Sequence, residues 1–354
     1  MQSTGTTLVK GIVAIIAALL LFAPFLFQDV RALEVAARIC IFIVLVASFD
    51  LLIGYTGIVS FAHTMFFGFG AYGAAILLKG MGPGWLPVIL GALSGVAVSI
   101  VFAVAIGLLS LRVKAIFFAM ITLAAASVVL VLASQLSQIT GGEDGMTYKA
   151  PDLFKPATKL LTDADGKVVK LWGVSLNGKI AAYYFVFAAS LLLFVTMLRF
   201  VGSPFGTVLK AIRENEARAE AIGYRVVAYR TMVFCVSAAI ASLAGTVYAV
   251  WLKYTGPDTS LSFAIMIDIL LMVVIGGMGT MWGAVIGAVL MILAQYYLRD
   301  LMGAASEATA GVPLLPELLA PDRWLFWLGI IFILLVYFFP KGIAGTAMAW
   351  GKKA

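Results

Sequence analysis

Long apolar runs follow one another along almost the whole chain, and they constrain its fold more than any other feature. A transmembrane helix needs about 20 mostly apolar residues, because the hydrocarbon core is roughly 30 Å thick and each helical residue rises about 1.5 Å. The third run is rich in glycine and the eighth and ninth are short, so we predict an all-α, polytopic membrane protein with about ten transmembrane helices, within a range of eight to ten. The runs are 8–27, 33–53, 60–79, 86–111, 115–138, 180–199, 229–252, 261–277, 281–298 and 323–340.

Composition excludes the main soluble classes. Of the 354 residues 63% are hydrophobic and 12% charged, with a mean hydropathy of +1.09. A soluble domain is nearer half apolar and a quarter charged, so a soluble enzyme is excluded. The net charge of +7 is spread over the ends of the apolar runs, which gives no support to nucleic-acid binding. Cys40 and Cys235 both lie inside apolar runs, so they predict neither a disulfide framework nor a thiolate metal site.

The first apolar run follows Lys10 and could serve as a signal peptide. It lacks a small-residue cleavage site and another run follows almost at once, so we expect it to be retained as a span. If both termini lie inside, Lys and Arg are more numerous on the inside once the long loop 139–179 is set aside. We therefore predict that both termini are cytoplasmic.

Two loops are long enough to have roles of their own. The loop 139–179 holds the turn Thr140–Gly145 and then Asp163–Gly166 between apolar flanks, which favours a hairpin. We expect this loop to form a small external cap. Residues 202–224 predict a single amphipathic helix at the inner surface, with Ser203 as N-cap, Pro204 as first helical residue and Gly223 as the stop. Its apolar positions, near helical spacing, are Phe205, Leu209, Ile212, Ala219 and Ile222.

Motifs for covalent chemistry are absent from the sequence. It contains no G-x-x-x-x-G-K-[ST], H-E-x-x-H, C-x-x-C or G-x-S-x-G pattern, so we expect neither ATP hydrolysis nor a metal site in this chain. His63 is the one histidine. An intramembrane hydrolase would need a serine facing it, and we take that as the least favoured alternative. We predict that the chain is not an enzyme.

Glycine marks two segments at membrane depth. The segment 54–73 holds five glycines together with Ser60 and His63, and two interpretations are equally open. Backbone freed from helix could line a watery cavity, or small residues could allow close helix packing. The segment 276–287 has successive G-x-x-x-G spacings, which favours packing. A weak similarity between the two segments suggests an internal repeat.

Ionisable residues inside the membrane are costly and usually face a cavity or a partner. Asp50 lies near the end of the second run, where pairing with a nearby base is the better interpretation, whereas the role of Asp268 in the eighth stays open. Either could be the ion site of an autonomous secondary transporter. A polar stripe in the fifth run, which includes Thr122, is more typical of helix-to-helix hydrogen bonding than of solute contact.

Five blocks of sequence, in order, make the resemblance to a known family specific. They are 54–73, 118–124, 140–145, 203–223 and 275–283. Together they resemble the LivM branch of branched-chain amino acid ABC importer permeases, from about residue 39 to residue 345. Four positions depart from the pattern of that branch: Ile58 replaces a common Gln, Ala62 a Gly, Thr207 an Arg and Ala284 a Pro.

The resemblance implies a type II ABC importer permease fold and a function. The chain would be one permease subunit translocating branched-chain amino acids across a bacterial inner membrane, with urea, short amides or aromatic acids as alternative solutes. Its partners would be a second permease, two ATP-binding subunits that hold ATP and Mg, and a periplasmic solute-binding protein. Pathway candidates are Gly57, Ser60, His63, Thr122 and Asp268. Residues 202–224 would be the coupling helix, with Arg213, Glu214, Glu216, Glu220 and Gly223 toward the ATPases. Glu143 and Asp144 would contact the binding protein or the outer gate, with a simple capped turn as the alternative.

Overall fold

The computed structural model describes residues 4–27, 29–110, 115–155, 158, 170–171, 174–175, 177–309 and 315–350. Within them, ten helical segments are long and apolar enough to cross a membrane, which confirms the predicted number. The long helices are α1 (Thr4–Leu26), α2 (Val30–Thr56), α3 (His63–Met81), α4 (Trp85–Ser110), α5 (Ala115–Gln135), α7 (Gly178–Val201), α10 (Val226–Leu252), α12 (Phe263–Gly276), α13 (Met281–Ala308) and α15 (Trp324–Phe338).

Short elements connect these helices. The helical ones are α6 (Ser137–Thr140), η1 (Gly142–Asp144), η2 (Asp152–Phe154), α8 (Pro204–Glu214), α9 (Glu216–Ala221), α11 (Pro257–Ser260), α14 (Leu315–Leu318), η3 (Pro321–Arg323) and α16 (Gly342–Trp350). The strands are β1 (Met146–Thr147), β2 (Lys170–Leu171), β3 (Val174–Ser175) and β4 (Tyr254–Thr255). They form two antiparallel pairs, β1 with β4 and β2 with β3. The predicted turn Asp163–Gly166 lies outside the described residues.

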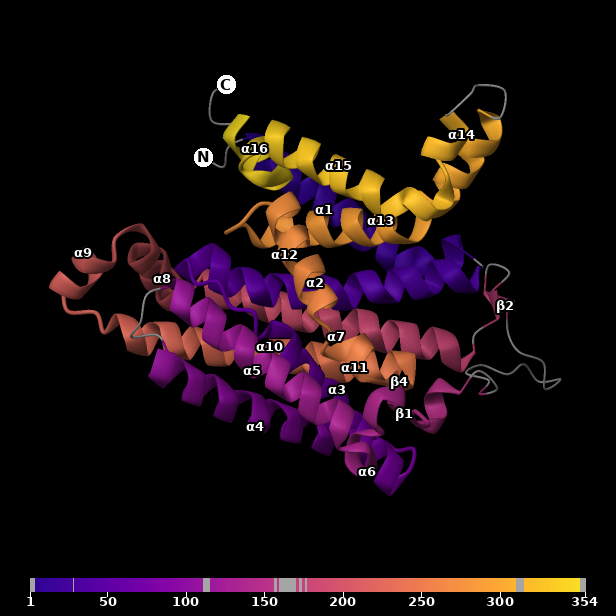
Figure 1. Ribbon diagram of the computed structural model, residues 1–354, viewed down its shortest axis with the longest axis horizontal. Coiled ribbons are helices and arrows are strands. Elements are labelled where there is room, and N and C mark those ends of the chain that lie inside the picture. The colour runs from indigo at the N-terminus through magenta and orange to yellow at the C-terminus, as the bar shows by residue number, and fades with distance from the viewer. Residues whose placement is uncertain are drawn as a thin grey trace.

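Two helices, α2 and α10, form the centre of the bundle. Buried residues make up 89% of the α2 span and 78% of the α10 span, against 22% for α1 and α5. A helix that is apolar on every side must be covered by other helices or by lipid. The sequence pattern is similar in all of them, so only their position in the bundle separates the central from the peripheral helices. In Figure 1 most of the long helices run side by side, α12 crosses them steeply, and α15 and α4 lie at opposite edges.

The chain repeats one arrangement of helices in two halves. In the first, α2 is followed by α3 and α4, which pack on each other; in the second, α10 is followed by α12 and α13, which also pack on each other. The two central helices touch, and each packs on the pair that follows the other: α10 on α3 and α4, α2 on α12 and α13. The two glycine segments are not equivalent in this arrangement, because 54–73 joins α2 to α3 whereas 276–287 joins α12 to α13.

The first glycine segment contains both non-helical backbone and close helix packing, and the lining of a watery cavity by that backbone stays a prediction. Helix α2 ends at Gly57, which has φ +72°, and residues 57–62 are not helical, so α3 begins at His63 rather than at residue 60 as predicted. Further on, glycines allow close packing: a Cβ on Gly70 would overlap the carbonyl oxygen of Ser242 on α10. In the second segment, a Cβ on Gly276 would overlap the carbonyl oxygen of Gly283, so α12 and α13 also pack closely, as the spacing predicted.

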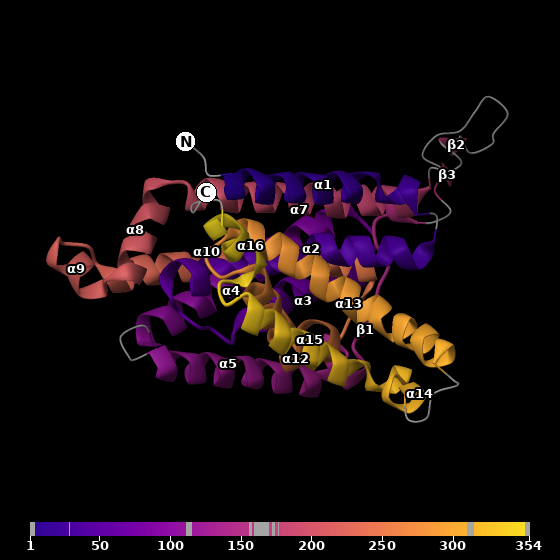
Figure 2. The ribbon, with the colours of Figure 1, turned by 90° about the horizontal axis from the view of Figure 1, so that it is seen from above.

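The two ends of the bundle differ. Figures 1 and 2 both show α8 and α9 projecting at one end, while β2 lies at the other. We call these the α8 side and the β4 side, since β4 follows the end of α10 that is far from α9. Helix α1 begins on the α8 side, where Gly5 packs against Ala347 of α16. The two ends of the described chain therefore lie on the same side, in keeping with an even number of spans.

Candidate functional site

The predicted coupling helix is two helices, not one. Ser203 caps α8 through the Gly206 N–H (3.4 Å) and Pro204 is its first residue, as predicted, but α8 stops at Glu214. Asn215 is extended (φ −157°, ψ 100°), and its side chain accepts a hydrogen bond from the Arg218 N–H (2.9 Å) to start α9. Asparagine competes for backbone hydrogen bonds in this way, which favours caps over helix interiors. The single-helix prediction for residues 202–224 is therefore wrong.

Helix α8 is fixed by its apolar face. Leu209 and Ile212 are buried, and Phe205 stacks on Tyr229 of α10 with ring centroids 5.1 Å apart. Ala219 of α9 is buried in the same cluster as Ile212. Ile222 was predicted on this face but is exposed, because α9 ends one residue before it and the chain turns away.

A junction on the α8 side ties this segment to both glycine segments. We define it as Asp50 and Gly54 of α2, Arg213 of α8, and Gly279 of the turn between α12 and α13. The Arg213 guanidinium donates to the Gly54 carbonyl oxygen, and the Gly279 N–H donates to Asp50 Oδ1 (2.8 Å). Gly279 has φ +79°, and a Cβ there would lie 2.8 Å from the Gly54 carbonyl oxygen. Only glycine meets both requirements.

The junction answers the question about Asp50. The side chain is buried, and Arg213 is near enough to attract it electrostatically. Its Oδ2 atom has no hydrogen-bond partner among the described residues. Asp50 is thus held by a backbone N–H and a nearby cation, as a buried carboxylate requires.

The predicted coupling residues fall into two groups. Arg213 contacts its own chain, and Glu216 forms a bidentate ion pair with Arg230 of α10, at 2.7 and 3.0 Å. Glu214, Glu220 and Gly223 are exposed. The first two residues therefore hold α8 and α9 against the bundle, while the other three remain on its outer surface.

His63 is a buried packing residue. Its Nε2 lies 2.8 Å from the Ser48 hydroxyl, and that hydroxyl donates to the Leu45 carbonyl oxygen at 2.7 Å. Because the Ser48 proton is used there, Nε2 carries the proton that joins the two side chains. Phe49 and Phe66 pack edge-on against the imidazole. A serine does face His63, but no orienting carboxylate accompanies Nδ1 among the described residues.

The non-helical stretch 57–62 runs back into the bundle. His63 follows it directly and lies beside Ser48, two turns before the end of α2. Thr122 of α5 accepts a hydrogen bond from the Phe61 N–H (3.0 Å), and Ser60 accepts one from the Ala62 N–H (3.3 Å). Thr122 thus supplies a hydrogen-bond partner to non-helical backbone, which lipid could not do. Of the five pathway candidates, Ser60, His63 and Thr122 come together here, and Gly57 opens the stretch.

Asp268 stands apart, on α12. It is partly buried, forms a hydrogen bond with the Gln295 side chain of α13 and lies in the electrostatic field of Arg38 on α2. Arg38 donates to the Tyr296 hydroxyl (3.0 Å). An arginine within a span is itself an unusual feature, and this signal in the sequence could have identified the partner of Asp268.

On the β4 side, the predicted acidic turn is clamped to the bundle. Glu143 and Asp144 lie in η1 with exposed side chains, while the Asp144 carbonyl oxygen accepts a hydrogen bond from the Tyr254 hydroxyl (2.9 Å). Met146 pairs with Thr255 in the β1–β4 ladder. The backbone of this turn is therefore fixed, and its two carboxylates remain free of ion pairs within the described residues.

A polar cavity of about 340 Å³ opens near this side between α2, α7, α10 and α13. It is lined by Glu34, Arg38, Lys179, Tyr248 and Lys253, among others. Burial, and then the nearby Lys179, lower the pKa of Lys253. No local pattern in the sequence marks this cluster, because its members come from helices that are far apart in the chain.

Comparisons with known proteins agree with the architecture. A family described as "Branched-chain amino acid transport system / permease component" matches residues 31–336. The chain is 27% identical to the high-affinity branched-chain amino acid transport system permease protein LivM of Salmonella typhimurium, over 76% of this chain and 64% of that protein. It is 26% identical to LivM of Escherichia coli, over 84% and 70%, and 26% identical to a probable LivM of Methanocaldococcus jannaschii, over 75% and 69%.

The chain thus spans 64% of the first of these relatives and about two thirds of each. No solved structure matches it. The family match covers both halves of the helix repeat, the junction and the β4-side turn. This multi-pass membrane protein therefore belongs to the family of branched-chain amino acid transport system permease components.

Proposed function

We propose that this chain is the membrane-spanning permease subunit of an ATP-binding-cassette importer for branched-chain amino acids. The family membership supports the class, and the names of the three relatives support the solute. The chain would perform no covalent chemistry. ATP and Mg would bind to two partner ATPases, since the sequence has no phosphate-binding loop of its own. A second permease and a solute-binding protein would complete the importer.

The junction is the observation that carries this proposal. Arg213 links α8 to the end of α2, and Asp50 links that same end to the turn between α12 and α13. A displacement of α8 would therefore move the end of α2, in the first half of the helix repeat, and the turn between α12 and α13, in the second. Rigid-body motion of packed elements is an established way of transmitting such a change. The exposed Glu214 and Glu220 lie where an ATPase would push.

This arrangement also gives the protein a sidedness. The α8 side would face the cytoplasm of a bacterium, with both termini, and the β4 side would face the periplasm. Glu143 and Asp144 would then meet the binding protein or shape the outer gate. The free carboxylates on a fixed backbone suit such a contact, because they cost little ordering on binding.

Uptake by the purified assembly tests the proposal. The full chain is purified with its co-purifying subunits, reconstituted into liposomes and supplied with binding protein and labelled leucine. We expect uptake only with ATP on the α8 side. The double variant Glu214→Arg with Glu220→Arg should lose the ATPases on purification, whereas Glu307→Arg, an exposed acid at the far end of α13, should keep them.

One outcome would contradict the importer, and a second would change only its solute. Uptake that needs no ATPase, follows an ion gradient and disappears in Asp268→Asn would mean a secondary transporter. ATP-driven uptake of urea, short amides or aromatic acids in preference to leucine would keep the importer and change its solute.

A further inference from the structure

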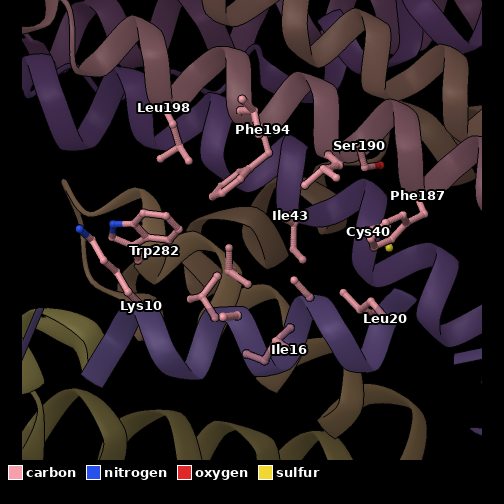
Figure 3. A pocket seen from close by; sticks show the side chains of 16 residues that line it. Lys10, Ile16, Leu20, Cys40, Ile43, Phe187, Ser190, Phe194, Leu198 and Trp282 are labelled. Carbon is pink, nitrogen blue, oxygen red and sulfur yellow. The ribbon is translucent and has the colours of Figure 1, made fainter. Parts of the chain in front are cut away.

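A long apolar groove lies on the flank of the bundle between α1, α2, α7 and α13. Its volume is about 450 Å³, and it runs along α1 from Lys10 to Leu20. At about 1.5 Å per helical residue this is roughly 15 Å, parallel to the membrane-crossing helices. Figure 3 shows that side chains from all four helices point into it.

The lining of the groove is mostly apolar, and its one charged side chain lies at one end. Of the 16 lining side chains, only those of Lys10, Cys40, Ser190 and Trp282 contain a heteroatom. The Lys10 amine and the Trp282 indole nitrogen point to the same end, as Figure 3 shows. Among the ion pairs of the described residues, none involves Lys10. This end is on the α8 side, where α1 begins.

The two walls of the groove differ in exposure. Its floor includes Cys40 and Ile43 of α2, both buried, whereas Leu191 and Val195 on its rim are 47% and 41% exposed. The groove is therefore open toward the medium that surrounds the transmembrane helices. Water is disfavoured there, because it would find few polar partners.

We propose that this groove binds an acyl chain of an anionic phospholipid from the leaflet on the α8 side. The apolar walls receive the chain, and at its end the Lys10 ammonium and the Trp282 N–H hold the phosphate. Lysine attracts a lipid phosphate electrostatically, and tryptophan prefers the membrane–water boundary, where its ring is apolar and its N–H is polar. A phospholipid, with its acyl chain joined through glycerol to a phosphate, presents apolar and anionic parts in this same order.

The size of the groove argues against a protein occupant. A helix about 10 Å across would fill this volume within roughly one turn. The lipid also explains why α1 is retained against the core through few direct contacts. The acyl chain of the lipid would fill the space between α1 and α7.

Lipid retention by the purified full chain tests this site. The protein is extracted from membranes rich in phosphatidylglycerol, and bound phospholipid is quantified by mass spectrometry after gel filtration. We expect one phosphatidylglycerol per chain above the background of a zwitterionic lipid. Lys10→Gln should weaken phosphatidylglycerol retention about fivefold, the value of one basic side chain at a membrane surface. Lys10→Arg should restore it.

Two further variants separate binding of the lipid headgroup from binding of the acyl chain. The Trp282 ring lies 6.1 Å from that of Phe194; Trp282→Phe keeps an aromatic ring at this position and removes the N–H, so it should weaken the headgroup preference only. Ala17→Leu fills the groove and should displace lipids of both kinds. Lys79→Gln, which changes an exposed lysine at the β4-side end of α3, is the matched control and should retain wild-type lipid.

The proposal fails if Lys10→Gln keeps wild-type phosphatidylglycerol, or if Lys79→Gln loses as much. It also fails if a photocrosslinking residue at position 191 attaches to protein instead of lipid. Each readout is independent of transport, so the lipid site and the importer can fail separately.

Discussion

Asp50 is a buried carboxylate that accepts one hydrogen bond, from the Gly279 N–H, and lies near the Arg213 cation. We predict that Asp50→Leu lowers the free energy of unfolding by about 1–3 kcal/mol, because it leaves that buried donor unpaired. Asp50→Asn keeps an acceptor oxygen and is the matched control. The check is the thermal melting midpoint of the purified chain. Equal midpoints for the two variants would contradict the role of this bond.

Gly54 is fixed by the same junction. Its backbone is helical, but a Cβ would lie 2.7 Å from the Asp50 carboxyl carbon and closer still to Gly279. We predict that Gly54→Ala separates α2 from the α12–α13 turn and lowers ATP-driven leucine uptake in liposomes. Gly80→Ala is the control, since Gly80 lies near the end of α3 with nothing near its Cβ position. Alanine there should stabilise the helix by about 0.5–1 kcal/mol.

Lys253 makes the stability of the folded chain depend on pH. Its ammonium donates to the Phe154 carbonyl oxygen (3.3 Å), and burial, then Lys179, lower its pKa in the folded chain. Lys253 therefore loses its proton at a lower pH in the folded chain than in the unfolded chain. Its contribution to the free energy of unfolding rises as the pH increases toward 10.5, the ordinary pKa of lysine. We predict that the gain in melting midpoint between about pH 8 and pH 10 shrinks in Lys253→Gln. Lys79→Gln should leave the gain unchanged.

At the scale of elements, the α8–α9 segment shows how one residue type changes a helix into two. The ion pair between Glu216 and Arg230 holds α9 on α10 after the break at Asn215. We predict that Glu216→Arg or Arg230→Glu alone impairs ATP-driven uptake, and that the double exchange restores most of it. Coupling energies of paired side chains are measured by such cycles. If Glu216 instead acts on an ATPase, the double exchange will be as defective as Glu216→Arg.

At the scale of the whole molecule, the even number of spans and the helix repeat predict a strict sidedness. With a membrane-impermeant maleimide, Glu220→Cys should be labelled only from the cytoplasm and Glu143→Cys only from outside. Both residues are exposed, while the natural Cys40 is buried and Cys235 lies within α10. Labelling of both positions from one side would overturn this topology.

Much of the local structure could be predicted from the residues, because it depends on neighbours in the chain. The ten apolar runs, the Ser203 cap and the close packing of Gly276 all follow from period, capping and residue size. Asparagine favours a cap at position 215, but the apolar spacing fits one continuous helix equally well. Only the packing of α9, with Ala219 beside Ile212 and Glu216 on Arg230, shows that two helices form.

The sequence by itself placed this protein in a membrane, predicted about ten spans and indicated its family, since these depend on apolar length and ordered motifs. Only the tertiary structure decided which spans are central and what each polar residue contacts. Asp50 meets Gly279 across 229 positions, and Arg213 meets Gly54 across 159. Because nearly every span is apolar all round, no periodicity marks the face that will meet a partner. That choice is made when the two halves of the repeat pack together.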